Sequence, residues 1–200
     1  MVTDPLIDLL DYRRQVNEIY QTVRTLRDRD PREAHRLWRE RRDELFRSHP
    51  QSALPESERA AFRGLPYREY DPAFAFTAKV RSVTHESYDV DTSTGGVIRF
   101  VRFGVVELPI GTLEVLWLDE YSGGVFLPFR DATSGKTTYG GGRYLLDTAK
   151  GADLGSSGDR LVLDFNFAYH PSCVYDPKWT CPLAPLSNRL TAAVEAGELS

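Results

Sequence analysis

Cysteine is scarce in this sequence, and long apolar runs are absent from it. Its 200 residues include 2 cysteines, too few for a disulfide scaffold, so we expect thiols in a reducing compartment. No apolar run approaches the roughly 20 residues that a membrane-spanning helix needs. Residues 1–8 lack the basic-then-apolar order of a signal peptide. These absences predict a cytoplasmic protein with no membrane partner.

Positive charge is not in excess either. The formal net charge is -4 and the pI is about 5.6, unlike a generally basic nucleic-acid binder. Acidic residues at helical spacing are interleaved with the arginines of one segment (Arg32, Arg36, Arg39, Arg41, Arg42 and Arg47). Such mixed charge is typical of a solvated helix with internal ion pairs. We therefore expect no nucleic-acid partner.

Hydrophobic material, by contrast, is plentiful. Hydrophobic residues make up 41% of the chain and aromatic residues 12%, which is enough for a real core and excludes wholesale disorder. The length fits one domain with a helical extension.

The first third of the chain follows a helical period. Asp4-Pro5 and Asp30-Pro31 are typical helix starts, with a capping aspartate and a proline at the first helical position. Apolar residues then recur at three- and four-residue steps, which predicts two amphipathic helices. The second should stop at His49, because a residue before proline is pushed out of the helical region. A short third helix is expected over residues 56–62.

From Ala73 the apolar period changes from helical to alternating. Turn residues separate the expected strands, which cover residues 74–81, 86–91, 97–108, 112–118, 124–129, 143–146 and 160–169. Residues 187–196 are expected to form a last helix. Many short strands joined by tight turns favour a curled antiparallel meander. The predicted fold class is α+β: N-terminal helices, residues 1–64, packed on a curled antiparallel β-sheet or β-barrel. Residues 65–200 form this β-rich part, with a proline- and cysteine-containing C-terminal loop, and we expect a single folding unit.

Two glycine-containing stretches superficially resemble phosphate-binding loops. Residues 134–138 end like a P-loop, but Arg130 stands where that pattern needs glycine, and a poor helix former follows. Gly140–Gly142 lacks the spacing of a dinucleotide fingerprint. A hairpin turn and a sharp bend are the better interpretations, with backbone contact to a ligand as the alternative at the glycines.

A histidine and the two cysteines lie close together near the C-terminus. His170, Cys173 and Cys181 could supply three zinc ligands, with Asp164 or His49 as a fourth. The seven-residue gap between the cysteines is unusual for a structural zinc site. A disulfide is another alternative, and two buried structural thiols are favoured over both. No cofactor is predicted.

An acid and an amide stand two residues apart on the last predicted strand. Asp164 and Asn166 would share one face of that strand. If this face lines a barrel interior, the pair could bind or activate a polar substrate, with Arg143 and Arg130 as candidate partners. In the alternative interpretation, Asp164 pairs with an arginine to join two strands, or faces water.

Several long sequence islands, in order, resemble one known family. They are residues 38–52, Phe62–Leu65, 126–135, 138–144, 164–183 and Asn188–Leu190. From about Trp38 to Gly197 the chain resembles the bacterial and archaeal family catalogued as domain of unknown function 1684. The resemblance carries no established activity, so it identifies the chain without explaining it.

The resemblance nominates the polar residues of those islands as site positions: His49, Ser52, Arg130, Asp131, Tyr139, Arg143, Tyr144, Asp164, Asn166, Tyr169, Asn188 and Arg189. It also implies asparagine where this chain has His170. A role that needs imidazole would not tolerate an amide, which lowers the expectation of zinc further.

Two functions remain open. The first is a small-molecule site, binding or hydrolytic, with Asp164, Asn166 and Arg143 as catalytic candidates; Arg130, Tyr144 and Asn188 would bind the ligand. The second is a non-catalytic binding or scaffold protein, in which the same side chains form a structural hydrogen-bond network. The first predicts a shared hollow, and the second predicts mutually satisfied polar groups.

Overall fold

Both long helices begin at the predicted capping aspartates. The computed structural model describes residues 4–200. In α1 (Pro5–Leu26), the Asp4 carboxylate accepts from the Leu6 amide at 2.8 Å, and in α2 (Pro31–Ser48), Asp30 accepts from the Glu33 amide at 3.0 Å. His49 is extended before its proline and ends α2 as expected. The third helix, α3 (Glu56–Arg59), is shorter than the expected 56–62.

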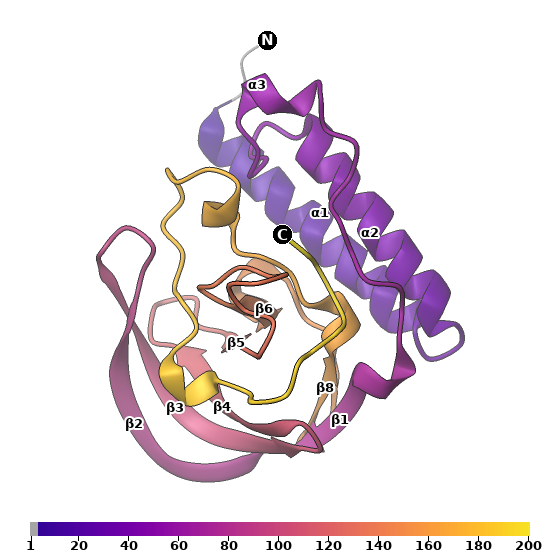
Figure 1. Cartoon of the computed structure of the whole chain (residues 1–200). Helices are drawn as coiled ribbons and strands as arrows, with labels where there is room; N and C mark the ends of the chain where they lie inside the picture. Colours follow the sequence, from indigo (N-terminus) through magenta and orange to yellow (C-terminus); the bar gives the residue numbers. More distant parts are fainter. Residues whose placement is uncertain (1–3) are drawn as a thin grey trace.

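The second part of the chain forms two antiparallel sheets (Figure 1). The larger has the order β2 (Arg81–Asp91), β3 (Val97–Leu108), β4 (Gly111–Leu118), β5 (Val125–Phe129) and β6 (Arg143–Asp147). The smaller has the order β1 (Ala75–Lys79), β8 (Arg160–Asp164) and β7 (Ser156–Ser157). Short 3-10 helices connect them: η1 (Pro72–Phe74), η2 (Thr148–Lys150), η3 (Phe165–Phe167), η4 (Ser172–Val174) and η5 (Leu186–Asn188).

The larger sheet curls, as the sequence predicts, but among residues 4–200 no closed barrel forms. The register shifts between Ser82 and Glu86, between Arg102 and Gly104, and between Leu127 and Pro128. Such bulges bend strands and increase their twist. Gly104 lies where the corner after β1 crosses β3, and a Cβ added there would meet the Val80 side chain at 2.4 Å. Glycine therefore permits the close approach.

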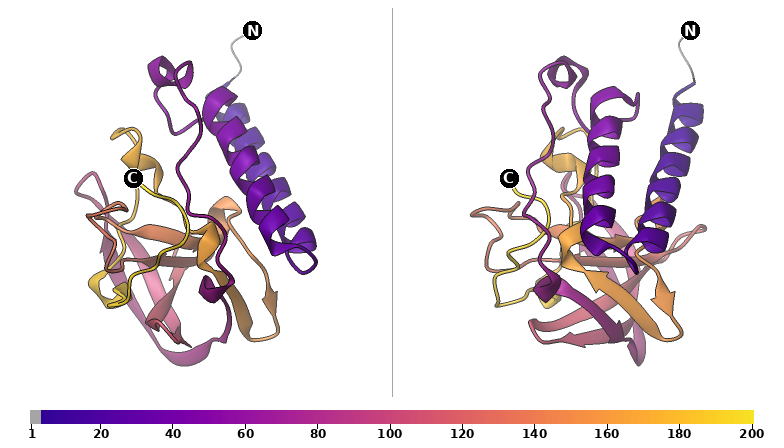
Figure 2. Two further views of the ribbon diagram at one scale, coloured as in Figure 1. Left: turned by 45° about the vertical axis from the view of Figure 1, so that its right-hand side comes forward. Right: turned by 90° about the vertical axis from the view of Figure 1, so that its right-hand side faces the viewer.

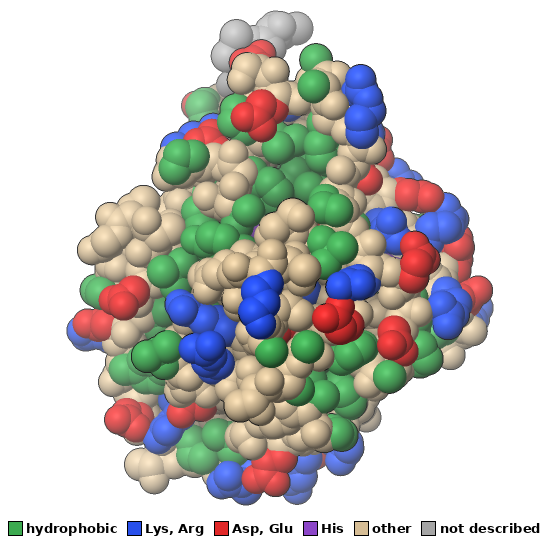
Figure 3. All heavy atoms as spheres, in the orientation of Figure 1, with side chains coloured by type: hydrophobic (Ala, Val, Ile, Leu, Met, Phe, Trp, Pro, Cys, Tyr) green, Lys and Arg blue, Asp and Glu red, His purple; other side chains and the backbone are tan. Residues whose placement is uncertain are grey.

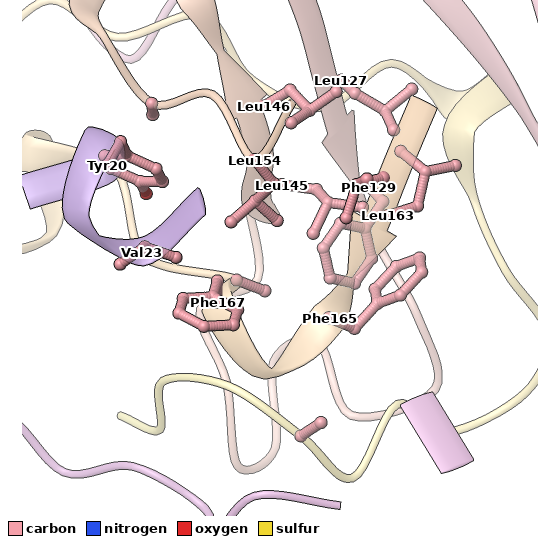
Figure 4. Close-up of a cluster of buried hydrophobic side chains, with 14 of the residues drawn as sticks. Tyr20, Val23, Leu127, Phe129, Leu145, Leu146, Leu154, Leu163, Phe165 and Phe167 are labelled. Atoms are coloured by element: carbon pink, nitrogen blue, oxygen red, sulfur yellow. The ribbon is translucent and has the colours of Figure 1, made fainter. Parts of the chain in front are cut away.

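Helices and sheets share one hydrophobic core. Figure 2 shows α1 and α2 standing side by side against the sheets. In Figure 4, Tyr20 and Val23 of α1 face Leu154 and Phe167. Val23, Trp38, Leu127, Phe165 and Phe167 are all 0% exposed. The division of the chain near residue 64 stays a prediction.

Two expected elements near the C-terminus are wrong. The strand expected over 160–169 ends at Asp164, whose carboxylate accepts from the Asn166 amide and starts η3. The helix expected over 187–196 is replaced by η5 and extended chain. There the Arg130 amide donates to the Asn188 carbonyl, and the Leu190 amide donates to the Arg130 carbonyl. Long-range pairing overrides the local helical preference.

Charges of both signs occur near one another on the surface. On the face in Figure 3, hydrophobic side chains form a band across the upper half, with acidic and basic groups around it. Of the helices within residues 4–200, none has the length and apolar character needed to cross a membrane.

Candidate functional site

β6 carries Arg143 into the interior, where only 1% of its side chain is exposed. Nη2 donates to Asp131 Oδ2 at 2.8 Å and to the Val194 carbonyl at 3.1 Å, while Nη1 donates to the Ala196 carbonyl. Burial lowers the pKa of Arg143, and the negative charge of Asp131 opposes this shift. Arg143 therefore ties the C-terminal segment to β6, and these donors are used within the protein.

Asp164 and Asn166 form a second buried group at the end of β8. Asp164 accepts from the Asn166 amide and side chain through Oδ1, and from the Tyr70 hydroxyl at 3.1 Å through Oδ2. The Asn166 side chain bonds both the amide and the carbonyl of Asp71, each at 2.8 Å. Burial raises the pKa of Asp164, against these hydrogen bonds. Together the two side chains fix the chain before β1 to the end of β8.

Asn188 makes a third set of contacts, on β4 and β5. Its side chain accepts from the Glu114 amide at 2.8 Å and donates to the carbonyls of Glu114 and Pro128 at 3.0 and 2.9 Å. Half-buried Arg130 meets this segment through its backbone. The side chain of Asn188 thus bonds the backbone of both β4 and β5, as a neighbouring strand would.

The residues singled out from the sequence therefore lie in separate places. Asp164 is brought to Asn166, and Asn188 to Arg130, but Arg143 pairs with Asp131 rather than with Asp164. Of the six principal candidates, only Tyr144 borders the cavity described below. Its hydroxyl donates to the Pro182 carbonyl.

His170, Cys173 and Cys181 are the metal-ligand candidates from the sequence. Within residues 4–200, no three histidine, cysteine, aspartate or glutamate side chains gather at metal-binding geometry. Both cysteines are free thiols; Cys181 is buried and Cys173 half-buried. His49, the possible fourth ligand, instead approaches Asp11 on α1, with Nε2 and Oδ2 3.3 Å apart.

A cavity of about 100 Å³ lies where α1 and α2 meet the loop after β8. Apolar side chains from both helices form part of its wall. The polar lining comes from both helices, from β6 and η2, and from the C-terminal loop: Tyr12, Tyr20, Arg42, Tyr144, Asp147, Lys150, Tyr169, His170, Ser172 and Cys181. Two parts of the chain that are distant in sequence thus build one cavity, in which polar groups lie within a mostly apolar wall.

Arg42 is the buried cation of this cavity, with 11% of its side chain exposed. Nη1 donates to the Tyr67 hydroxyl at 2.7 Å and to Glu198 Oε2 at 3.1 Å. The guanidinium lies 4.9 Å from the Trp38 ring and 4.8 Å from the Tyr169 ring, so cation–π contacts hold it in place. Among residues 4–200, Nε and Nη2 donate no hydrogen bond. Arg42 is therefore rigid but incompletely paired.

Two tyrosine hydroxyls of the lining, those of Tyr12 and Tyr169, also lack a hydrogen bond within the described residues, and the hydroxyl of Tyr20 interacts with the indole of Trp38. Burial raises the pKa of Tyr20 to about 12 and raises the pKa of Tyr12 and Tyr169 as well. All three hydroxyls therefore stay protonated near neutral pH and are available as donors.

Asp147 and Lys150 form an ion pair at the edge of the cavity. The Lys150 ammonium lies 3.5 Å from Asp147 Oδ2, and the side chain of Lys150 is 57% exposed against 9% for Asp147. The charge of Asp147 raises the pKa of Lys150. A carboxylate thus faces inward and its cation faces solvent.

His170 is buried and neutral. Burial lowers its pKa to about 3, and the positive charges of Arg143 and Arg42 act in the same direction. Nε2 accepts from the Tyr139 amide at 3.2 Å, so the ring proton is on Nδ1. Its acceptor nitrogen is already occupied, which leaves it poorly suited to act as a general base.

Sequence reasoning missed Arg42, Tyr12, Tyr20, Asp147 and Lys150. A signal for Arg42 was present, because Trp38 and Phe46 stand four residues before and after it. Residues four apart share a helix face, so Arg42 belongs to the apolar face of α2. Asp147 and Lys150 carry no comparable signal, since their place depends on how the helices pack against β6.

Comparison with known proteins supports the family resemblance seen in the sequence. A search of the curated proteins finds no match. A solution NMR structure of an uncharacterized protein from Haloarcula marismortui is similar, with 37% identity, a TM-score of 0.56, and coverage of 81% of this chain and 90% of that one. A family model described as a protein of unknown function, DUF1684, matches residues 60–199. The match spans more than half of the chain, so the protein belongs to the DUF1684 family.

Proposed function

We propose that the protein binds a small organic carboxylate in the cavity between α1, α2 and β6. One observation carries the proposal: Arg42 lines this cavity while its Nε and Nη2 have no hydrogen-bond acceptor among residues 4–200. A carboxylate can accept two parallel N–H bonds from a guanidinium, and such charge-assisted bonds are stronger than neutral ones. A rigid, largely buried and incompletely paired arginine is therefore suited to this ligand class.

The tyrosine hydroxyls supply further donors. Tyr20 and Tyr169 remain protonated near neutral pH, because burial raises the pKa of each. A carboxylate held by Arg42 could accept from them as well. Glu198 contacts Arg42 only through Nη1, which leaves the other guanidinium nitrogens for a ligand, and at the edge of the cavity Lys150 balances the inward-facing carboxylate of Asp147.

The size of the cavity limits the ligand. About 100 Å³ is of the same order as the roughly 150 Å³ apolar cavity that binds benzene, so the ligand must be small. Val16, Ile19 and Leu45 in the wall offer apolar contact for its hydrocarbon part. A short aliphatic or single-ring carboxylate has both required features.

Binding is favoured over hydrolysis by the contacts of the acid–base candidates. His170 has its acceptor nitrogen occupied by the Tyr139 amide, and the carboxylate of Asp164 accepts from Asn166 and Tyr70. Arg143, Asp164, Asn166 and Asn188 instead support the second function expected from the sequence, a structural hydrogen-bond network. The proposed ligand site uses a different set of residues.

A chemical-shift titration tests the proposal. The ¹⁵N-labelled protein is titrated with sodium benzoate, propionate and acetate, and with benzamide as the neutral counterpart of benzoate. We expect benzoate to shift amides around Tyr20, Tyr169 and Cys181, and to bind at least about tenfold more tightly than benzamide. If no carboxylate shifts these amides, or if benzamide binds as well as benzoate, the proposal is wrong.

Matched tyrosine variants localise the binding. Tyr20→Phe removes only a hydroxyl, so it should weaken benzoate binding by roughly two- to tenfold, as expected for one net hydrogen bond. Tyr88→Phe is the control, because its hydroxyl donates to Glu114 on the sheet, away from the cavity. Equal effects of the two variants would place any binding elsewhere.

A further inference from the structure

The two cysteines meet at a fold-back of the C-terminal loop. η4 places Cys173, and the amide of Trp179 donates to the Asp176 carbonyl at 3.2 Å, which reverses the chain before Cys181. The thiols of Cys173 and Cys181 lie close enough for each to be the main influence on the pKa of the other. Seven residues separate the cysteines in sequence, but the turn brings their thiols together.

The turn between β2 and β3 holds the second cysteine in place. The Ser93 amide donates to the Cys181 carbonyl at 2.9 Å, and the Cys181 amide donates to Ser93 Oγ at 3.1 Å. Next to these contacts, Thr92 and Pro182 form an antiparallel bridge. Cys181 is thus fixed on both sides of its backbone, whereas half-buried Cys173 lies nearer to solvent.

We propose that this pair is a redox modification site, in which Cys173 reacts with a peroxide and Cys181 then closes a reversible disulfide. In the first step, the Cys173 thiolate attacks hydrogen peroxide, a sulfur–oxygen bond forms, the oxygen–oxygen bond breaks, and hydroxide leaves. The product is a sulfenic acid. In the second step, the Cys181 sulfur attacks the Cys173 sulfur and water leaves. Overall, two thiols and one peroxide give one disulfide and two waters.

The surroundings of the pair assign these two roles. Interaction with the Cys181 thiol is the main cause that lowers the pKa of Cys173, and the nearby hydroxyls of Ser93 and Tyr139 act in the same direction. The contact with Cys173, together with burial, raises the pKa of Cys181. Since the thiolate is the nucleophile toward peroxide, the half-buried cysteine reacts first and the buried one resolves the sulfenic acid.

This site borders the proposed ligand cavity but does not depend on it. Cys181 and Ser172 line that cavity, so a disulfide would stiffen one of its walls. The chemistry at sulfur needs no bound carboxylate. A test at the level of protein mass therefore stays informative even if no ligand binds.

Intact-mass analysis of the full-length protein tests the proposal. The reduced protein is treated with hydrogen peroxide and then with N-ethylmaleimide. We expect a product that has lost two hydrogen atoms, takes up no maleimide, and yields a Cys173–Cys181 cross-linked peptide that dithiothreitol cleaves. Accumulation of oxygen adducts on Cys173 in the presence of unreacted Cys181, or two fully alkylated thiols after treatment, would overturn it.

Single substitutions separate the two roles. Cys181→Ser should stop at a sulfenic acid on Cys173 that dimedone traps, and Cys173→Ser should leave Cys181 largely unreacted. Tyr139→Phe removes one donor to Cys173, so its alkylation by iodoacetamide should need a higher pH, whereas Tyr121→Phe, at a fully exposed position, should behave like the unsubstituted protein. If Cys173→Ser and Cys181→Ser react with peroxide equally fast, the assignment of roles is wrong.

Discussion

Burial decides what each arginine of α2 does. Arg36 is exposed, and its bonds to Glu33 and Glu40 lie in water, where solvent screens helical ion pairs and they contribute little to stability. Arg42 occupies the buried face of the same helix and meets Glu198, which is 0% exposed. Removing one partner of a buried pair leaves an uncompensated charge and costs far more. The same residue type thus serves solubility at one position and a candidate site at the other.

His170 makes stability depend on pH. Its pKa in the folded protein is about 3 because of burial, whereas an unfolded histidine titrates near 6.5. The unfolded chain therefore binds a proton first as the pH falls, so the stability contributed by neutral His170 is present above about pH 6.5 and is lost as the pH falls toward 3. His170→Asn, which keeps a side-chain acceptor for Tyr139, should flatten this loss by about 1.4 kcal/mol per pH unit.

Urea unfolding at several pH values between about 4 and 7 measures this difference. Comparison with the unsubstituted protein at each pH cancels the contributions of groups such as Asp164 and buried His35, which are common to both proteins. Glu198 is coupled to the substituted ring, because its Oε1 lies 3.8 Å from His170 Nδ1. His85 lies exposed on β2, so His85→Asn serves as the control and should leave the acid limb unchanged. Parallel curves for His170→Asn and the unsubstituted protein would contradict a buried neutral imidazole.

At the scale of elements, local signals predicted the helices and most strands. Asp4 and Asp30 cap α1 and α2 because capping needs only neighbouring backbone amides. The ends of the C-terminal elements were not predictable in this way. Asp164 ends β8 through contacts with Asn166 and with Tyr70, and Tyr70 is distant in sequence. A pattern within one segment cannot report such partners.

Asn188 is the residue that replaces the expected C-terminal helix by sheet-like pairing. Asn188→Ala would leave the Glu114 amide and the carbonyls of Glu114 and Pro128 without their side-chain partner. Unpaired buried groups cost about 1–3 kcal/mol, and we expect a loss in the upper part of this range in urea unfolding. Asn17→Ala in α1 is the control, because Asn17 is exposed and bonds only within its own helix; it should change stability by less than about 0.5 kcal/mol. Equal losses of stability for the two variants would contradict the structural role of Asn188.

At the scale of the whole molecule, the composition and the spacing of apolar residues predicted how helices and sheet are arranged. They did not predict which buried polar side chains pair with one another. Helices on a curled antiparallel sheet follow from the change of apolar period near Ala73. The pairing of Arg143 with Asp131, and of Arg42 with Glu198, depends on how the C-terminal segment closes over the sheet. The candidate cavity belongs to this level as well, because neither the helices nor the C-terminal loop forms it alone. This is why few residues of the cavity lining were nominated from the sequence. Tyr144 and Tyr169 were nominated as site positions, and His170 and Cys181 only as metal candidates.

The shared core predicts that helices and sheets unfold together. Val23 of α1 is 0% exposed and belongs to the same hydrophobic cluster as Leu127 and Leu145 of β5 and β6. Val23→Ala should therefore destabilise the sheet as well as the helix, by about 1.5–3 kcal/mol. Amide hydrogen exchange of the slowest β6 amides measures the effect, since these amides report global unfolding. Leu6→Ala changes the same helix at a position that is 74% exposed, so β6 should exchange at its original rate. If Val23→Ala accelerates exchange in α1 while β6 stays unchanged, then residues 1–64 and 65–200 unfold as separate units.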